Sequence, residues 1–193
     1  MFTTPRFEIE DTTVTGAFAD VDAPAGTIRH ATLDRVELTG ARLRSLTLTD
    51  VVARAIEASG GDWTGARMRQ VELTGCRLAG LRLIEADLQD VVFRDCRLSL
   101  AMFRGAKLRD VTFSGCALDE ADFTSATLTT VRFEACRLLA TDFTGTTLRR
   151  VDLRGSELDP IGNLRGAIID SVQLAGLAPL LARAAGLTVR DED

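Results

Sequence analysis

A five-residue period runs through most of this chain, and no other feature of the sequence restricts the fold as much. The 27 positions reached by counting in fives from Ile28 to Leu158 hold 16 Leu, six Phe, two Ala and one each of Ile, Trp and Met. The positions two residues before them are mostly small. This period matches neither an α-helix, which repeats every 3.6 residues, nor a long β-strand, which repeats every two.

Short extended pieces joined by corners explain the period. Within an extended piece, residues two apart point to the same side, so both apolar series face inward and the residue between them faces outward. The remaining two residues of each unit turn the chain. Nine of the 16 glycines fall on the second of these corner residues, which indicates a positive φ or a tight approach there.

A second period, four times the first, shows how many pieces close one turn. The four cysteines, Cys76, Cys96, Cys116 and Cys136, each lie four five-residue units after the previous one. Phenylalanines recur at every second unit, at Phe93, Phe103, Phe113, Phe123, Phe133 and Phe143, with Leu78 and other leucines at the centres between them. These spacings predict an all-β solenoid with four sides per coil and about 6–7 stacked coils over residues 26–160.

Several five-residue units also resemble a known family, the pentapeptide-repeat proteins. Their loose motif is a small residue, Asp or Asn, Leu or Phe, and two variable residues, and it is matched by ADLQD (86–90), ADFTS (121–125), TDFTG (141–145) and VDLRG (151–155). The resemblance covers residues 26–160 and implies a right-handed quadrilateral β-helix. It extends distantly to the mycobacterial fluoroquinolone-resistance members, which implies DNA mimicry towards a type II topoisomerase and a dimer formed through the C-terminal ends.

One stretch, residues 51–63, fits the repeat less well. Alanine occupies two successive centres, Ala53 and Ala58, and Trp63 occupies the next. Either Trp63 fills the space that Ala53 leaves on the opposite side, or a loop bulges from the coil here. We favour the filled core.

The two ends of the chain depart from the period. Residues 1–25 keep Phe18 in register but not Ile9 or Val14, so we expect an irregular N-terminal coil that acts as a cap. Residues 161–193 are expected to hold a last extended segment at 164–169 and then helical structure. A stack of coils needs such covers because its end rungs are unpaired.

The C-terminal segment carries helix signals. Asp170 or Ser171 suits a helix start, Pro179 suits the first turn of a second helix, and Gly186 suits a helix stop. An apolar stripe is formed by Leu174, Leu177, Leu181 and Ala184. We expect this stripe to cover the end of the core, and the alternative is a homodimer seam.

Signs of catalysis or of a metal centre are few. His30 is the only histidine, there is no tyrosine, and no GxSxG, CxxC, HExxH or phosphate-loop pattern occurs. Neighbouring cysteines in a stack lie about 4.8 Å apart, too far for an easy disulfide, and four collinear thiols cannot surround a zinc ion. We therefore expect buried packing thiols, no enzyme, no cofactor and no metal, with His30 a corner residue.

The remaining candidates lie on outward positions. Ile84, Leu100 and Met102 form a candidate apolar patch, and a corner column holds Asp50, Asp90 and Asp110 with Gln70 between them. Arg77, Arg97 and Arg137 form a third column. Solenoids usually bind partners on such columns.

The function predicted from the sequence is a non-enzymatic scaffold for an unspecified protein partner, and the alternative is the gyrase-binding DNA mimic that modulates quinolone sensitivity. The chain has 28 acidic and 23 basic residues, so its net charge of −5 is spread over a mixed surface and direct nucleic-acid binding is not expected. No signal peptide and no apolar run long enough to span a bilayer is present, so we expect no membrane contact and a cytoplasmic location.

Overall fold

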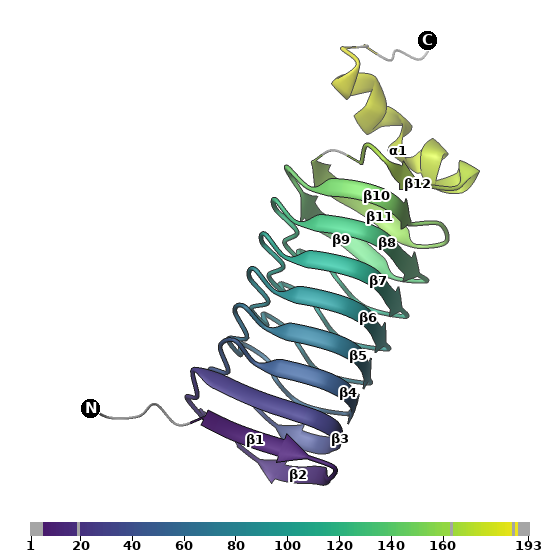
Figure 1. The fold of residues 1–193 in the computed structure, drawn as a ribbon. Helices are drawn as coiled ribbons and strands as arrows, with labels where there is room; N and C mark the ends of the chain where they lie inside the picture. The colour runs from purple at the N-terminus through teal and green to yellow at the C-terminus, as the bar shows by residue number, and fades with distance from the viewer. Residues whose placement is uncertain (1–5, 19, 163, 187, 189–193) are drawn as a thin grey trace.

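The computed structural model describes residues 6–18, 20–162, 164–186 and 188, and they form a right-handed quadrilateral β-helix followed by one α-helix (Figure 1). The solenoid has about eight turns, more than the six to seven expected for residues 26–160, because the segments on both sides add to the stack. The elements are β1 (Arg6–Glu10), β2 (Thr13–Ala17), β3 (Ala25–Glu37), β4 (Thr47–Arg54), β5 (Arg67–Thr74), β6 (Asp87–Arg94), β7 (Lys107–Ser114), β8 (Thr127–Glu134), β9 (Arg137–Phe143), β10 (Thr147–Asp152), β11 (Glu157–Gly162), β12 (Ala167–Ile168) and α1 (Ser171–Ala184).

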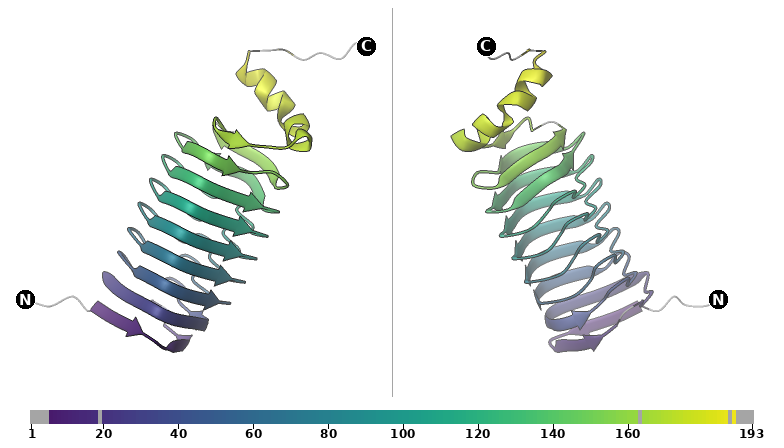
Figure 2. Two further views of the ribbon diagram at one scale, coloured as in Figure 1. Left: turned by 45° about the vertical axis from the view of Figure 1, so that its right-hand side comes forward. Right: turned by 180° about the vertical axis from the view of Figure 1, so that it is seen from behind.

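Stacking follows the longer period. Strands β3 to β8 and β10 pair in parallel, and each residue lies opposite its equivalent four units further on, as Thr27 does with Thr47. These strands form the broad sheet at the front of Figure 1, whereas two other sides are held largely by single bridges such as Arg77 to Arg97. Figure 2 shows the same stack turned by 45° and from behind.

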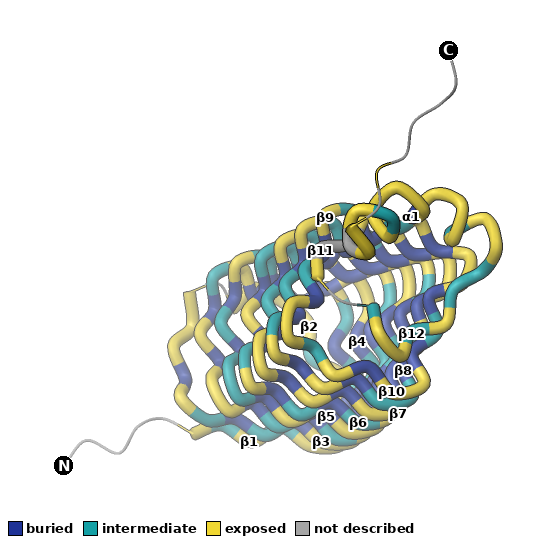
Figure 3. Tube along the Cα trace, turned by 90° about the horizontal axis from the view of Figure 1, so that it is seen from above, coloured by how far each residue is buried: buried dark blue, intermediate teal, exposed yellow. Residues whose placement is uncertain are grey.

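The corners explain the five-residue spacing of glycine. From His30 to Gly155, every fifth residue has a positive φ, and glycine occupies nine of these positions. The other corners carry non-glycine residues in the same left-handed conformation, for example Ala55 with a φ of 50°. In the view from above in Figure 3, buried and exposed residues alternate around each coil.

The interior is a continuous apolar column. The six phenylalanines are buried and stack in two series, with ring centroids 4.9 Å apart for Phe93 and Phe113 and 4.7 Å apart for Phe103 and Phe123. Rings on opposite sides meet edge to face, as Phe113 does with Phe123 at 6.4 Å. Both arrangements suit the charge distribution of aromatic rings.

The stretch 51–63 stays within the coil. Ala53, Ala58 and Trp63 are buried, and the pairing of β4 with β3 and β5 is unbroken across it. Gly61, two residues before Trp63, is also buried. The Trp63 indole N–H is the one buried side-chain polar atom in the described part of the chain that lacks a hydrogen-bond partner.

The cysteines form a buried column of four free thiols. The Cys96 thiol lies 3.3 Å from the Leu73 carbonyl oxygen of the coil below, and the other three make the same kind of contact. Hydrogen bonding between neighbouring thiols raises the pKa of Cys96 and of Cys136 and lowers that of Cys76 and of Cys116, so the four thiols do not titrate independently. Their burial and regular stacking make them small packing groups of the core.

The first coil is one residue short. Ile9 pairs with Ile28 and Val14 with Leu33, an offset of 19, and the offset becomes 20 after a bulge between Val14 and Gly16. Ile9 and Val14 thus pack on the core although the sequence places them out of register. The N-terminal end of the core is open and forms a cavity of about 270 Å³. Its lining is entirely apolar: Phe7, Ile9, Val14, Phe18, Val21, Ile28, Leu33, Val36, Leu38 and Leu43.

The C-terminal end holds a single helix, so the second helix expected to start at Pro179 is absent from the described residues and Pro179 lies inside α1. Asp170 is the N-cap, and its carboxylate accepts a hydrogen bond from the Gln173 N–H, while the Gln173 side chain accepts one from the Asp170 N–H. This reciprocal pair is a capping box. The helix continues through Pro179 although proline has no N–H to donate to the carbonyl oxygen four residues earlier.

Candidate interaction faces

Two outward columns lie on adjacent sides of the rod. The Met102 column consists of Asp22, Arg42, Asp62, Arg82, Met102, Asp122 and Asp142, each bridged to the next through the backbone. The Arg97 column consists of Glu37, Glu57, Arg77, Arg97, Ala117 and Arg137. The corner between the two columns carries Leu100. Each column is straight because every coil repeats the last.

Most acids on the Met102 column are neutralised by arginine. The Asp62 carboxylate lies 2.9 Å from Arg44 and 3.8 Å from Arg82, and Asp122 pairs with Arg104. Partial burial alone would raise the pKa of Asp62, but hydrogen bonds from Thr64 and Arg44 outweigh it and hold the pKa below its ordinary value. Acidic and basic side chains therefore pair with one another along this side of the rod.

The Arg97 column is less completely paired. Arg137 makes a bidentate contact with Asp119, and Arg77 lies 3.7 Å from Glu57. For Arg97 no ion pair is found among the residues that the structure describes, and its side chain is exposed. An unpaired guanidinium therefore stands beside the Leu100 corner.

Leu100 is unusual at its position. Its side chain is 53% exposed and its φ is 61°, a left-handed conformation that costs an ordinary residue about 1–2 kcal/mol. The equivalent corners of the coils below are Gly40, Gly60 and Gly80. Other corners carry small, polar or charged residues, and Leu100 is the one large aliphatic residue with a positive φ in the described part of the chain. Neither burial nor backbone preference explains a leucine here.

The structure brings only some of the predicted surface residues together. Leu100 and Met102 lie on one coil, around the corner from Arg97, with Met102 partly buried. Ile84 lies at the far corner of the Met102 column. We call the surface formed by Arg97, Leu100 and Met102 the Leu100 patch.

The acidic corner column is elsewhere on the rod. Asp50, Asp90 and Asp110 are exposed, and they lie at the corner about which β4, β6 and β7 bend. This corner is diagonally opposite the Leu100 corner in the four-sided coil. The two predicted surfaces are therefore separate.

The C-terminal stripe is also divided. Leu177 is 5% exposed and is the one member of the stripe found buried, whereas Leu174 and Leu181 are half exposed and the side chain of Ala184 lies outside the described part. Gln173 fixes the helix by donating to the Leu153 and Ser156 carbonyl oxygens at 2.6 and 2.7 Å. Helix α1 thus touches the last coil through its first turns and projects from it (Figure 2).

One side-chain cluster was missed from the sequence. His30 lies at a corner as expected, but Glu10 and Asp11 lie beside it. The repeat itself places Glu10 four units before His30, but an irregular N-terminal coil was expected and the repeat was not extended to it. The observed offset of 19 pairs Glu10 with Arg29 and brings Asp11 opposite His30.

Comparison with protein families assigns the repeat. The model described as a pentapeptide repeat region matches residues 59–123 and 86–161, together more than half of the chain. The chain belongs to the pentapeptide-repeat family. The matched segment includes the Leu100 patch and all four cysteines of this pentapeptide-repeat protein.

Comparisons with individual proteins add the following. No curated protein sequence matches the chain. Among solved structures, full-length QnrB1, a plasmid-mediated fluoroquinolone resistance protein, is 17% identical, with a TM-score of 0.49 over 88% of this chain and 99% of that chain. HetL, a pentapeptide repeat protein involved in heterocyst differentiation regulation from the cyanobacterium Nostoc sp. strain PCC 7120, is 20% identical, with a TM-score of 0.41 over 86% of this chain and 91% of that chain.

No helix among the described residues has the length and apolar character needed to cross a membrane.

Proposed function

We propose that this pentapeptide-repeat protein is a non-enzymatic interaction module that binds a protein partner through the Leu100 patch. The observation that carries the proposal is Leu100 itself, an exposed aliphatic side chain held in an unfavourable backbone conformation. Strain that persists without a packing benefit suits a functional position. An exposed leucine next to an unpaired arginine suits a partner that offers an apolar pocket with a carboxylate at its rim.

A glycine at this corner separates binding from folding. Leu100→Gly restores the residue found at Gly80 and removes the exposed side chain, so we expect the variant to fold at least as stably as the parent. A photo-crosslinking residue at position 100 should capture one partner from cells, and Leu100→Gly should abolish its co-purification. The matched control is Val52→Thr, an outward position on another side where a later coil has Thr112.

Two results would contradict this assignment. Partner binding that survives Leu100→Gly would place the contact elsewhere, and equal loss with Val52→Thr would show a general surface effect. Measuring the unfolding midpoint of each variant keeps a folding defect from being mistaken for lost binding.

The alternative, a DNA mimic acting on gyrase, requires a continuous negative face in place of phosphates. The pairing of Asp62, Asp122 and Asp119 with arginines speaks against such a face. A supercoiling assay with purified gyrase, with and without a quinolone, decides this point. Inhibition that persists in Leu100→Gly would favour the mimic.

We also propose that α1 mediates a homodimer. The helix exposes Val172, Leu174, Leu180 and Leu181, an apolar surface that a second copy would cover. Light scattering should then show a dimer that becomes a monomer in the double variant Leu174→Asp, Leu181→Asp. A parent chain that is monomeric at about 100 μM contradicts the proposal, since that concentration exceeds the Kd of ordinary dimers.

The four free thiols support a reducing compartment, and the cytoplasm is our proposal for the location.

A further inference from the structure

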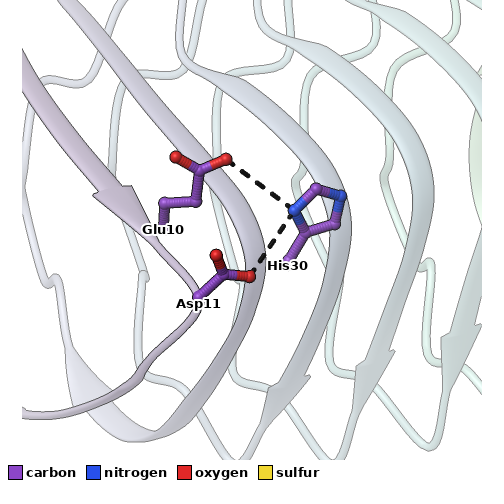
Figure 4. A group of neighbouring side chains, drawn as sticks. All are labelled: Glu10, Asp11 and His30. Carbon is purple, nitrogen blue, oxygen red and sulfur yellow. Dashed lines mark ion pairs between the residues drawn. The ribbon is translucent and has the colours of Figure 1, made fainter.

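The first coil gathers three side chains that ligate metals in other proteins (Figure 4). The His30 Nδ1 atom lies 3.8 Å from a Glu10 carboxylate oxygen and 3.7 Å from an Asp11 carboxylate oxygen. One ligand atom from each residue lies within 4.8 Å of the other two. We propose that Glu10, Asp11 and His30 form a binding site for a divalent transition-metal ion of the Zn²⁺ type.

The backbone holds the three residues in place. Glu10 pairs with Arg29 in the parallel ladder of β1 and β3, and the Asp11 N–H donates to the Arg29 carbonyl oxygen at 3.2 Å. Asp11 and His30 have φ values of 50° and 46° and occupy equivalent corners of successive coils. The side chains therefore start from two neighbouring rungs, and only their own rotamers must adjust to receive an ion.

The spacing fits one ion. Zinc binds imidazole nitrogen and carboxylate oxygen at about 2.0–2.2 Å, so two ligand atoms on a tetrahedral ion are about 3.4 Å apart. The distances from the His30 Nδ1 atom to the two carboxylate oxygens are a few tenths of an ångström longer. A small inward movement of exposed side chains closes this difference, and water supplies the fourth ligand from the open side.

The local charge favours a cation. With a neutral imidazole the cluster carries two negative charges. No arginine or lysine pairs with Glu10 or Asp11 in the part of the chain that the structure describes, because Arg29 is engaged with Glu8 at 3.2 Å. A metal ion would thus meet two carboxylates that no guanidinium already neutralises.

The ligand types select the metal. Mg²⁺ and Ca²⁺ take oxygen ligands, whereas an imidazole favours Zn²⁺ and neighbouring transition metals. The four thiols, which zinc would otherwise prefer, are buried and do not compete in the folded protein. The site should therefore take Zn²⁺ in the presence of excess Mg²⁺.

The test uses the untagged full chain after treatment with a chelator. Zn²⁺ is titrated at pH 7.5 in the presence of excess Mg²⁺, with calorimetry for stoichiometry and nitrogen-15 NMR for the imidazole. Because His30 is the only histidine, the imidazole spectrum reports this site alone. We expect one ion per chain and a shift of the single imidazole signal.

Variants then assign the ligands. Glu10→Gln, Asp11→Asn and His30→Asn should each weaken binding by at least about 10-fold, since even indirect supports of metal ligands contribute that much. Asn also tolerates the left-handed φ at Asp11 and His30. The matched control is Asp110→Asn, at the same corner four coils beyond His30, which should leave the affinity unchanged.

Three outcomes overturn the proposal. These are no zinc binding by the parent chain, a zinc complex in which the imidazole signal does not move, and binding that survives His30→Asn. Each would leave the cluster as an ordinary surface ion pair.

Discussion

At the scale of single residues, the corners carry a cost that recurs along the rod. In the described part of the chain, every residue other than glycine that has a positive φ lies at a corner position. A residue with a Cβ is less stable than glycine in this left-handed conformation, by about 1–2 kcal/mol. The solenoid tolerates these residues because the ladders on both sides of a corner fix its conformation.

A reciprocal pair of substitutions measures this cost. Ala55 has a φ of 50°, and the equivalent corner one coil later is Gly75, beside which an added Cβ meets nothing within 4 Å. Ala55→Gly should stabilise the fold by about 0.5–1 kcal/mol, which is the relief of left-handed strain less the added entropy of glycine in the unfolded chain. Gly75→Ala should destabilise it by a similar amount. Urea unfolding checks both, and changes of equal sign would refute the corner argument.

Substitution in the phenylalanine column should change stability more than substitution at a corner. The Phe113 ring stacks between Phe93 and Phe133, with centroids 4.9 Å from each. Phe113→Ala should lower the free energy of unfolding by about 3–5 kcal/mol because it empties a rung that neighbours on both sides hold open. Phe18→Ala, at a side chain that is 42% exposed, is the control and should cost much less. A Phe113→Ala melting temperature within a degree of the parent would show that the rung can refill.

At the scale of elements, α1 depends on one polar side chain for its position. The Gln173 amide donates to two carbonyl oxygens of the last coil, those of Leu153 and Ser156. Gln173→Ala should weaken docking by about 1–3 kcal/mol, the contribution of two hydrogen bonds. Hydrogen exchange should then quicken in residues 171–184 and stay slow in β5 to β8. Uniform quickening throughout would mean that the helix supports the whole rod.

The N-cap makes the same helix sensitive to acid. Hydrogen bonds from the backbone N–H groups of Gln173 and Gly155 lower the pKa of Asp170 below the ordinary 3.8. Because the pKa of Asp170 is lower in the folded protein, its carboxylate contributes fully to the stability of α1 above the ordinary pKa. This contribution is lost as the pH falls through the pKa of the folded state. Exchange in residues 171–184 should therefore rise below about pH 4. Asp170→Asn keeps an acceptor, so α1 in that variant should lose this pH dependence.

Sequence periodicity predicts the middle of the molecule well and its ends less well. Between Gly16 and Asp159 the offset between paired coils is 20 residues, so the inward positions of one coil predict those of the next. The offset changes at both ends, to 19 between β1 and β3 and to 16 between β10 and β12, and a pattern read in fixed steps cannot locate such a shift. The prediction from Pro179 was wrong for a different reason: proline is common in the first turn of a helix, but here it lies in the interior of α1.

The surface was predictable only in part, because outward residues vary without affecting the core. The order of residues along one coil placed Leu100 and Met102 near each other. By contrast, the conformation of Leu100 and the pairing of Asp62 with Arg44 depend on side-chain contacts that the sequence pattern does not contain. The Glu10, Asp11 and His30 cluster required only that the repeat be extended to the first coil, because Glu10 lies four units before His30.

At the scale of the whole molecule, the constant offset makes each coil removable. Deleting residues 87–106 joins Ala86 to Lys107, a residue equivalent to Asp87, and preserves every inward position. We expect a cooperative fold with a urea m-value lower by roughly a tenth, in proportion to the buried surface lost. Deleting residues 87–104 instead shifts the pattern by two and should give a severely destabilised chain. Equal stability of the two deletions would refute the coil as the unit.

The fixed advance per coil has a further consequence for the two surface features proposed above. Each coil lengthens the rod by about 4.8 Å, so the Leu100 patch stands about three and a half coils, or roughly 17 Å, along the axis from His30. Inserting one coil between them would increase that separation by one step and leave both features chemically intact. The number of whole coils encoded between the two surface features therefore sets the distance between them.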